Sequence, residues 1–431
     1  MTRTVAVDEL KVGMFVHLDL GWMSHPFPRS SFRIADTQQI DTIRGLGLAV
    51  LRWDPERSQV VDPAPVPEGE PAPMAAPPAR APLETEASPQ ERAAQARRAE
   101  LAQQREAAEL CEAQYQEAGD AWQQAFEQVL ERPEAARRDT EALSRALLDK
   151  MLVEGEMCIR VLNAASGDRA TAHAMNVAVI SLLMGRVFGL DDEELSDLGT
   201  GALLHDVGKL GVPERLRHPD EKFTAAEHKA YTDHVANGVH QARRMGLSRG
   251  ATLVIAQHHE MADATGFPQK LPNDRLSMAA RVVSLVNRFD NLCNPPVLAR
   301  ALTPHEALSQ LFSQARSKFD ATVLNTFIRM MGVYPAGSVV QLTDDRYALV
   351  MTVNSSRPLR PHVLVHDPDV PRDEALHLDL EAVPDLGIRR SIRAAQLPPD
   401  ALSYLAPRPR VAYFFEPGPA PAVERPDRNQ G

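Results

Sequence analysis

The chain has 431 residues, a hydrophobic content of 44% and a formal net charge of −11. This length suffices for two or three domains with a sizeable core, and the acidic balance argues against a polymeric nucleic acid as partner. No run of about 18 apolar residues is present, which argues against a membrane span, and the N-terminus lacks the apolar core of a signal peptide. The three cysteines have neither metal-site nor disulfide spacing, so we expect a reducing, cytoplasmic location.

Residues 1–60 are expected to form a small N-terminal α+β module. Residues 5–20 alternate apolar and polar positions in the manner of strands. Residues 36–48 predict a short helix closed by Gly45 and Gly47. Residues 48–53 predict a further strand.

A proline-rich stretch, residues 61–90, predicts an extended linker, and residues 91–150 predict a helical connector. One face of this connector carries an apolar residue every three or four positions: Tyr115, Ala118, Trp122, Phe126 and Val129. We expect this face to pack on the rest of the chain, and a dimer interface is the alternative. Pro133 interrupts the helix, and a second helix is expected over about 138–165.

Residues 151–332 carry the chemistry, on what we expect to be a bundle of helices. Two sharp motifs stand out, LLHDVGKLGVP at 203–213 and QHHEMADATGFP at 257–268. The candidate metal ligands are His173, His205, Asp206, His234, His258, His259 and Asn287. Imidazole and carboxylate ligands that converge in this way favour a transition-metal centre able to hydrolyse phosphate esters.

Helical geometry supports this interpretation at two positions. Apolar residues follow His173 at helical spacing and place it near the buried face of its helix. His205 and Asp206 are neighbours at the end of a predicted helix, and neighbouring helical side chains point about 100° apart. They can therefore serve two metals, with the Asp206 carboxylate as the bridge.

After Gly332 the pattern changes to short β-rich runs separated by turn residues. We interpret residues 333–395 as a small antiparallel β unit and residues 396–431 as a loose, proline-rich tail. The fold class is therefore mainly α, with a helical bundle flanked by a small N-terminal α+β module and a small C-terminal β unit.

The motifs HDVGKLGVPE, HHE and D-x-x-G-F-P resemble the signature of the HD-GYP branch of the HD phosphohydrolases, over roughly residues 160–330. The usual form is HD-I-G-K-I-G-I-P, then HHE with D-G-x-G-Y-P. The resemblance implies an HD-type helical bundle that hydrolyses cyclic di-GMP with two or three metals, usually iron or manganese. Residues 1–60 resemble the small domain often found ahead of such bundles, and we interpret their element Trp22–Phe27 as a packed aromatic corner.

The resemblance also implies roles for single residues. Lys209 would stabilise charge on the scissile phosphate, and Asp206 would share the catalytic role as the bridging ligand. Glu260 and Asp290 would support the ligands from behind, Glu260 by orienting an imidazole. Asp290 would replace Asn287 as a ligand only if its helix shifted. The loop and substrate positions are Asp263, Gly266, Phe267, Pro268 and Arg300.

Three departures from the family pattern concern ligand and substrate positions. Asn287 stands where the family has an aspartate ligand, and loss of that charge should weaken metal binding. The Arg-Pro-Tyr strip that grips the dinucleotide is replaced by residues 293–300, in which Arg300 is the basic residue. Ala264 and Phe267 replace the glycine and tyrosine of the GYP loop, and the Ala264 side chain disfavours a positive φ.

These observations favour a cytoplasmic phosphodiesterase that cleaves cyclic di-GMP to pGpG, and onward to GMP, by in-line attack of a hydroxide bridging two metals. Arg169 stands where three-metal members have a glutamate, so a third metal is not expected. A catalytically degenerate protein that binds nucleotide or a partner is the alternative, and a phosphohydrolase of another nucleotide is a third hypothesis. The expected partners are cyclic di-GMP as substrate or ligand, and either a second copy in a homodimer or signalling proteins of the diguanylate-cyclase type.

Overall fold

The structure is a computed structural model of the chain. It describes residues 3–59 except 22, 23, 26, 28 and 29, and residues 88–151, 157–162, 168–354, 357, 359–375 and 377–417. Residues 61–87 of the linker predicted over 61–90, and part of the element Trp22–Phe27, therefore lie outside the described residues, while the last two residues of that linker, 89 and 90, already belong to a helix. The chain divides into two compact units, Met1–Gln103 and Gln104–Gly431, and the division falls inside one long helix.

The N-terminal unit holds the predicted α+β module, in which a helix covers an antiparallel sheet with the strand order β1-β4-β2-β3. Its elements are β1 (Arg3–Ala6), β2 (Phe15–His17), β3 (Ser31–Arg33), α1 (Thr37–Gly45) and β4 (Val50–Asp54). Asp36 caps α1 by accepting a hydrogen bond from the Gln39 backbone N–H at 2.8 Å. Ile40 and Ile43 then point into a core that also contains Phe27.

The second unit begins within α2 (Pro89–Glu127), whose apolar face packs on the helical bundle. Tyr115, Trp122 and Val129 are buried there. The Trp122 indole Nε1–H donates to the Leu203 carbonyl at 2.9 Å. This face is therefore covered by its own chain, which confirms the prediction over the dimer alternative.

Pro133 opens α3 (Pro133–Met151) after a short turn. The helix predicted over 138–165 is wrong beyond Met151, because β5 (Met157–Val161) follows instead. All five β5 side chains are buried. The strand lies between β7 and β11 in a sheet, and this burial on both sides overrides the helical pattern that precedes it.

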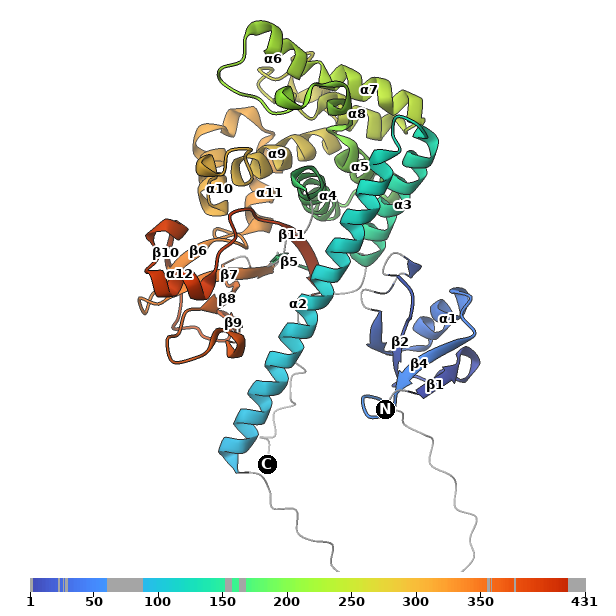
Figure 1. Ribbon diagram of the computed structural model, residues 1–431, viewed down its shortest axis with the longest axis vertical. Coiled ribbons are helices and arrows are strands. Elements are labelled where there is room, and N and C mark those ends of the chain that lie inside the picture. Colours follow the sequence, from blue (N-terminus) through green and yellow to red (C-terminus); the bar gives the residue numbers. More distant parts are fainter. Residues whose placement is uncertain are drawn as a thin grey trace, which may run out of the picture. The chain divides into compact units, whose positions relative to one another are not determined.

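The bundle surrounds one central helix, α4, which contacts α3, α5, α9 and α11 (Figure 1). Its elements are α4 (Arg169–Val187), α5 (Asp192–Leu204), α6 (Ala225–Thr232), α7 (His234–Met245), α8 (Arg249–Gln257), α9 (Met278–Cys293), α10 (Pro304–Gln314) and α11 (Ala321–Met331). By length and composition α4 could cross a membrane, but 72% of its apolar window is buried inside the protein. It is thus the core helix of the bundle.

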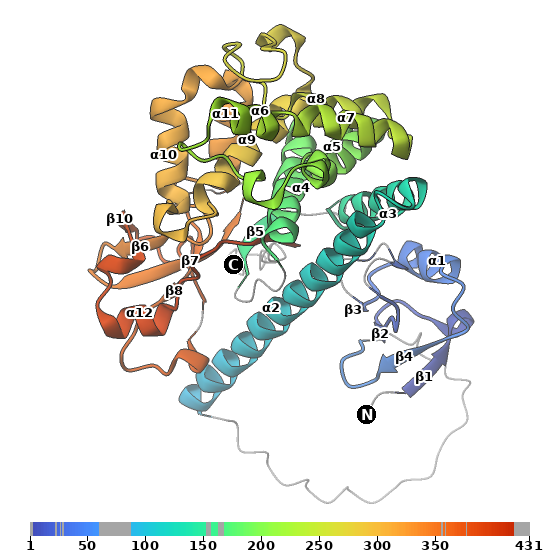
Figure 2. The ribbon, with the colours of Figure 1, turned by 45° about the horizontal axis from the view of Figure 1, so that its top comes forward.

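An antiparallel sheet lies beneath α10 in the second unit (Figure 2). Besides β5 it contains β6 (Val339–Leu342), β7 (Tyr347–Asn354), β8 (His362–Val365), β9 (His377–Asp379), β10 (Ile388–Ile392) and β11 (Tyr413–Pro417), and α12 (Pro399–Leu405) packs on β7. The sheet therefore contains the predicted β unit at 333–395 and two further strands, β5 from before it in the sequence and β11 from after it.

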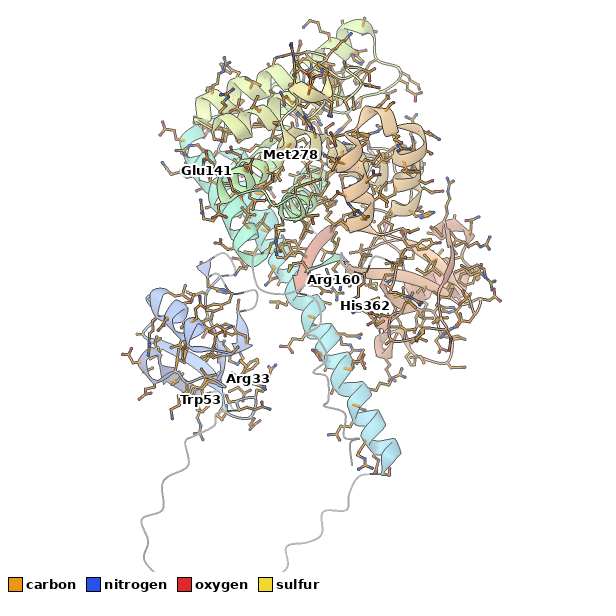
Figure 3. The ribbon with its side chains drawn as sticks, turned by 180° about the vertical axis from the view of Figure 1, so that it is seen from behind. Arg33, Trp53, Glu141, Arg160, Met278 and His362 are labelled. Carbon is orange, nitrogen blue, oxygen red and sulfur yellow. The ribbon has the colours of Figure 1, made fainter. Side chains whose placement is uncertain are left out.

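The prediction of a loose tail over 396–431 is wrong for its first part. Residues 399–405 form α12, and Tyr413, Phe414 and Phe415 are buried in β11. β11 pairs with β5, and the Arg160 guanidinium, labelled in Figure 3, forms an ion pair with Glu416 at 2.5 Å. The proline content of this region concealed a core strand, and residues 418–431 lie outside the described residues.

A short 3₁₀ helix, Val207–Gly211, follows α5 and crosses α7 at very close range. A Cβ atom added at Gly208 would lie 1.8 Å from the His234 carbonyl oxygen and 2.3 Å from the Gly238 nitrogen. Both atoms belong to the backbone and cannot move aside. Glycine at this position therefore fixes the distance between the segment with Asp206 and the helix with His234.

We predict that Gly208→Ala lowers the free energy of unfolding by about 1–3 kcal/mol, because the methyl group forces the two backbones apart. Thermal or urea unfolding measures this. Gly211→Ala is the matched control, since its Cβ would meet the flexible Asn237 side chain at 3.1 Å. Equal stability of the two variants would contradict the prediction.

Candidate metal centre

Six of the predicted ligands come together where helices of the bundle begin or end. His173 lies in the first turn of α4 and His234 is the first residue of α7. His205 directly follows the last residue of α5 and is followed by Asp206. In the same way, His258 directly follows the last residue of α8 and is followed by His259. Helix ends bring these side chains to one place without interrupting the apolar packing between the helices.

The ligands form two groups that share Asp206. One group is His173, His205 and Asp206, and the other is Asp206, His234, His258 and His259, with ligand atoms within 4.8 Å of one another in each. Asp206 Oδ2 lies 3.7 Å from His173 Nε2 and 3.5 Å from His205 Nε2. Its Oδ1 lies 3.7 Å from both His234 Nε2 and His258 Nε2. One carboxylate thus faces two sets of imidazoles.

Backbone carbonyl groups fix the orientation of three of these imidazoles. The Nδ1–H groups donate three residues back along the chain, from His205 to Ala202 O at 2.7 Å, from His234 to Tyr231 O at 2.5 Å and from His258 to Ile255 O at 2.8 Å. With the proton on Nδ1, the Nε2 lone pair of each ring faces the cluster, as a metal ligand requires.

The electrostatics keep His234, His258 and His259 neutral. Burial lowers the pKa of His234 to about 4, and it also lowers the pKa of His258 and, strongly, that of His259. Burial by itself would raise the pKa of Asp206, but the Lys209 charge and contacts with His205 and His258 hold it well below the usual range. At neutral pH the group of His234, His258 and His259 therefore offers neutral imidazoles beside an ionised carboxylate.

Two details fit bound divalent cations. Asp206 Oδ1 is buried and has no hydrogen-bond partner among the residues that the structure describes, which is costly for a carboxylate oxygen unless a cation compensates. The Nε2 atoms of His173 and His205 lie 3.1 Å apart, and those of His234 and His258 lie 3.3 Å apart. Lone pairs at such distances repel one another unless a shared cation lies between them. The nitrogen and oxygen donor set suits a transition metal.

Lys209 lies at the edge of this cluster. Its Nζ donates to Asp206 Oδ2 at 2.6 Å, and its side chain is largely buried. The ammonium group is also 6.0 Å from the centre of the Tyr231 ring. A phosphate group at the cluster would therefore meet this cation, and the role of Lys209 toward it stays a prediction.

Asp290 supports His173 from behind. Its Oδ2 accepts a hydrogen bond from His173 Nδ1 at 2.6 Å. Its Oδ1 accepts from Asn176 Nδ2 at 2.7 Å and from Asn294 Nδ2 at 2.8 Å. Both oxygens are therefore engaged, and the carboxylate directs Nε2 of His173 toward Asp206.

The same two asparagines bind the segment that leads into β11. The Val411 carbonyl accepts from Asn176 Nδ2 at 3.0 Å and from Asn294 Nδ2 at 2.9 Å. The backbone N–H groups of Val411 and Tyr413 donate to Asn294 Oδ1 at 2.9 Å and Asn176 Oδ1 at 2.8 Å. Sequence reasoning missed both asparagines, although a polar residue one turn after His173 in an apolar helix was a usable signal.

Two predicted positions have no described contact with the cluster. Asn287 is buried on α9, and its Oδ1 accepts a hydrogen bond from Asn291 Nδ2 at 2.6 Å. The oxygen expected to coordinate is therefore already engaged. Arg300 is exposed, and no interaction of its side chain with a ligand residue is described. The roles of both residues stay predictions.

Glu260 differs from expectation, because it does not orient an imidazole. Its two carboxylate oxygens accept hydrogen bonds from the backbone N–H groups of Gln269, at 2.6 Å, and Leu271, at 3.0 Å. The residue is buried and holds the end of the loop at 263–272. A carboxylate next to a pair of histidines suggested an imidazole partner. Instead, both of its oxygens accept hydrogen bonds from the backbone of the loop.

The remaining loop residues pack against the histidine pair. Phe267, which precedes Pro268, stacks on His259 with ring centroids 4.5 Å apart. A Cβ atom at Gly266 would lie 2.4 Å from the Met261 nitrogen, so glycine is needed there. Asp263 accepts hydrogen bonds from the backbone and hydroxyl of the nearby Thr265.

Ala264 in this loop adopts the left-handed backbone conformation that its side chain was expected to disfavour, with a φ of 60°. Such a conformation costs a non-glycine residue about 1–2 kcal/mol. The hydrogen bonds of Asp263 and Glu260 hold the loop and offset this strain.

Two further residues near the ligands, Tyr231 and His218, were missed from the sequence, and the contacts of Arg169 were not foreseen. The Tyr231 hydroxyl lies 3.4 Å from His259 Nε2. Arg169 Nη1 lies 2.9 Å and 2.7 Å from the two ring nitrogens of His218, and Arg169 Nε donates to the Asn294 carbonyl at 3.3 Å. The side chain at position 169, where three-metal members have a glutamate, is therefore a guanidinium group with a histidine and a backbone carbonyl as partners.

Comparison with known proteins agrees with the motifs. Residues 2–140 match a family model described as a domain of unknown function (DUF3391), and residues 156–323 match the model of the HD domain. The first of these models spans the α+β module, the linker and most of the helical connector.

Among characterised proteins, the chain is 26% identical over 385 residues, 85% of each chain, to the cyclic di-GMP phosphodiesterase PA4108 of Pseudomonas aeruginosa. It is 24% identical over 191 residues to the cyclic di-GMP phosphodiesterase PdeB of Borreliella burgdorferi, covering 44% of this chain and 50% of that one. It is 25% identical over 186 residues to the 3'3'-cGAMP-specific phosphodiesterase 2 of Vibrio cholerae, covering 42% and 36%. The matches thus place an HD domain at residues 156–323, in agreement with the resemblance of the motifs, and a DUF3391 domain ahead of it at residues 2–140.

Proposed function

We propose that the chain is a metal-dependent phosphodiesterase that hydrolyses cyclic di-GMP to pGpG and onward to GMP. The observation that carries this proposal is the Asp206 carboxylate shared by two groups of imidazoles. The names of the relatives from Pseudomonas aeruginosa and Borreliella burgdorferi support the substrate. The proposal includes two metals, iron or manganese, and a cytoplasmic location. Metal analysis and turnover of cyclic di-GMP by protein purified without oxygen test it.

The proposed chemistry assigns separate tasks to the chain and to the metals. When bound, two metals supply an activated water and neutralise phosphate charge. Asp206 would hold both through its two oxygens, and the histidines keep their Nε2 atoms directed at them. Lys209, 2.6 Å from Asp206, would donate to a phosphate oxygen on which negative charge develops. Phe267 shields His259 from water on the loop side.

A degenerate signalling protein remains the second candidate. Asn287 brings no charge, and its oxygen is engaged by Asn291. Arg300 is exposed and has no described contact with the ligands. Hydrolysis of a different cyclic dinucleotide is the third candidate, and it is supported by the named specificity of the Vibrio cholerae relative.

We predict that His205→Ala abolishes phosphodiesterase activity and removes at least one metal, because this ring faces Asp206 in the smaller ligand group. Wild-type protein should bind no more than two transition-metal ions per chain by elemental analysis. His240→Ala, an exposed histidine on α7, is the control and should keep both metals. Turnover by the His205 variant near the wild-type rate would refute the metal assignment.

We predict that Asn287→Asp raises metal affinity about 10-fold or more, because the new carboxylate keeps the oxygen that accepts from Asn291 and adds a negative charge. Hydrolysis should rise with occupancy if the site is merely weakened. Higher occupancy without hydrolysis favours the signalling protein, because metals cannot replace substrate positioning. Loss of existing activity would mean that the amide has a positive role.

We predict that Asn176→Ala weakens one of the two metals about 10–100-fold and spares the other, because Asp290 would no longer be held against His173. Titration with cobalt(II), followed by its absorption spectrum, resolves the two sites. Asn273→Ala is the control, since this amide donates to Asp320 instead. Equal weakening of both metals would indicate general destabilisation and contradict a positioning role.

A further inference from the structure

The guanidinium group of Arg410 has no partner in the part of the chain that the structure describes. It is only partly exposed, and its Nη1 is buried without a hydrogen bond. No ion pair of this residue with a described carboxylate is formed. An unpaired buried guanidinium nitrogen is costly, so the arrangement calls for an anion from outside the chain.

The backbone next to Arg410 is held firmly. Val411 bonds through both its N–H and its carbonyl to the Asn294 side chain, at 2.9 Å each. Its carbonyl also accepts from Asn176 at 3.0 Å. These are the asparagines that support Asp290 and His173, so Arg410 emerges at a defined place beside the metal ligands.

A second guanidinium group, that of Arg169, lies in the same neighbourhood. Its Nε donates to the carbonyl of Asn294, the residue that also anchors Val411. Its other described partner is His218, whose pKa is lowered to about 4 by burial and by the charges of Arg169 and Lys209, so that the ring is neutral. Arg169 therefore has a neutral ring and a carbonyl as partners, and no described carboxylate pairs with it.

The charge of Arg410 acts on the guanidinium group of Arg169. Burial and the charge of Arg410 lower the pKa of Arg169, while Asp290 and Asp206 raise it. Both carboxylates already have other partners, namely His173 with two asparagines for Asp290 and Lys209 for Asp206. Two like charges near each other, without a counter-ion, are stabilised by a ligand that carries negative charge.

We propose that Arg169 and Arg410 together bind a phosphate group of a nucleotide, on the His173 side of the metal centre. Two guanidinium forks match the oxygens of a phosphate group better than any other side chains. The pair would position a phosphate group other than the one held by the metals. It would thereby bind the dinucleotide in place of the Arg-Pro-Tyr strip that residues 293–300 replace. This inference rests on the proposed function for its substrate, but not for the site itself.

The test compares Arg169→Gln and Arg410→Gln with one control, Arg186→Gln, and with a rival position, Arg300→Gln, in the metal-loaded full chain. Arg186→Gln removes a partly buried guanidinium from the last turn of the same helix, α4, and Arg300→Gln removes the basic residue that the sequence suggested. KM and kcat for cyclic di-GMP, and the inhibition constant of inorganic phosphate, are measured for each. Circular dichroism and metal content verify that each variant is folded and loaded.

We expect each of the two variants to raise KM and the phosphate inhibition constant about 10–100-fold, the loss typical of one charge-assisted contact, with kcat changed much less. The Arg186→Gln control should match the wild type. Unchanged constants in the Arg169 and Arg410 variants, or a large effect of Arg300→Gln alone, would overturn the assignment.

The site and the proposed function can fail separately. If the wild-type protein does not turn over cyclic di-GMP, equilibrium dialysis measures its binding of that nucleotide instead. Binding that is lost in the Arg169 and Arg410 variants then supports the phosphate site in a protein without phosphodiesterase activity. Turnover by the wild type with normal KM in both variants would refute the site and leave the proposed function standing.

Discussion

The Asp206 carboxylate is the group on which the rest of the centre depends. It is ionised, shielded from solvent on one oxygen, and faced by imidazoles from four helices. Withdrawing a carboxylate from water is expensive unless cations compensate it. Lys209 supplies one positive charge, and the unpartnered oxygen leaves room for more. The ends of α4, α5, α7 and α8 meet where they do because each contributes a side chain to this one group.

Hydrogen bonds to the Nδ1 atoms of the histidines fix the direction in which their Nε2 atoms point. Backbone carbonyls orient three of them, and Asp290 orients His173. Asn176 and Asn294 then join Asp290 to the backbone before β11. The supports of the centre therefore extend beyond residues 156–323, which match the HD domain, to a strand near the end of the described chain.

Charge is distributed unevenly in this molecule. The chain carries a net charge of −11, yet Lys209, Arg169 and Arg410 gather around the ligands. Local groups, not the total, set the potential that a small anion meets, because screening limits the reach of distant surface charges to about 10 Å. A nucleotide phosphate and an acidic protein surface are therefore compatible in one chain.

The sequence by itself determined the elements whose signals are local. Alternation of apolar and polar residues predicted the N-terminal α+β module, helical spacing predicted the packed face of α2, and the motifs gave the six candidate ligands that lie together, while the family resemblance implied the HD-type bundle. Only the tertiary structure decided the rest. β5 and β11 pair although about 250 residues separate them, and the same return of the chain brings Val411 to Asn294 and Arg410 near Arg169. The Glu260 carboxylate likewise accepts its hydrogen bonds from the backbone of the loop and not from a histidine. Such contacts depend on which distant segments meet, and local periodicity carries no information about that choice.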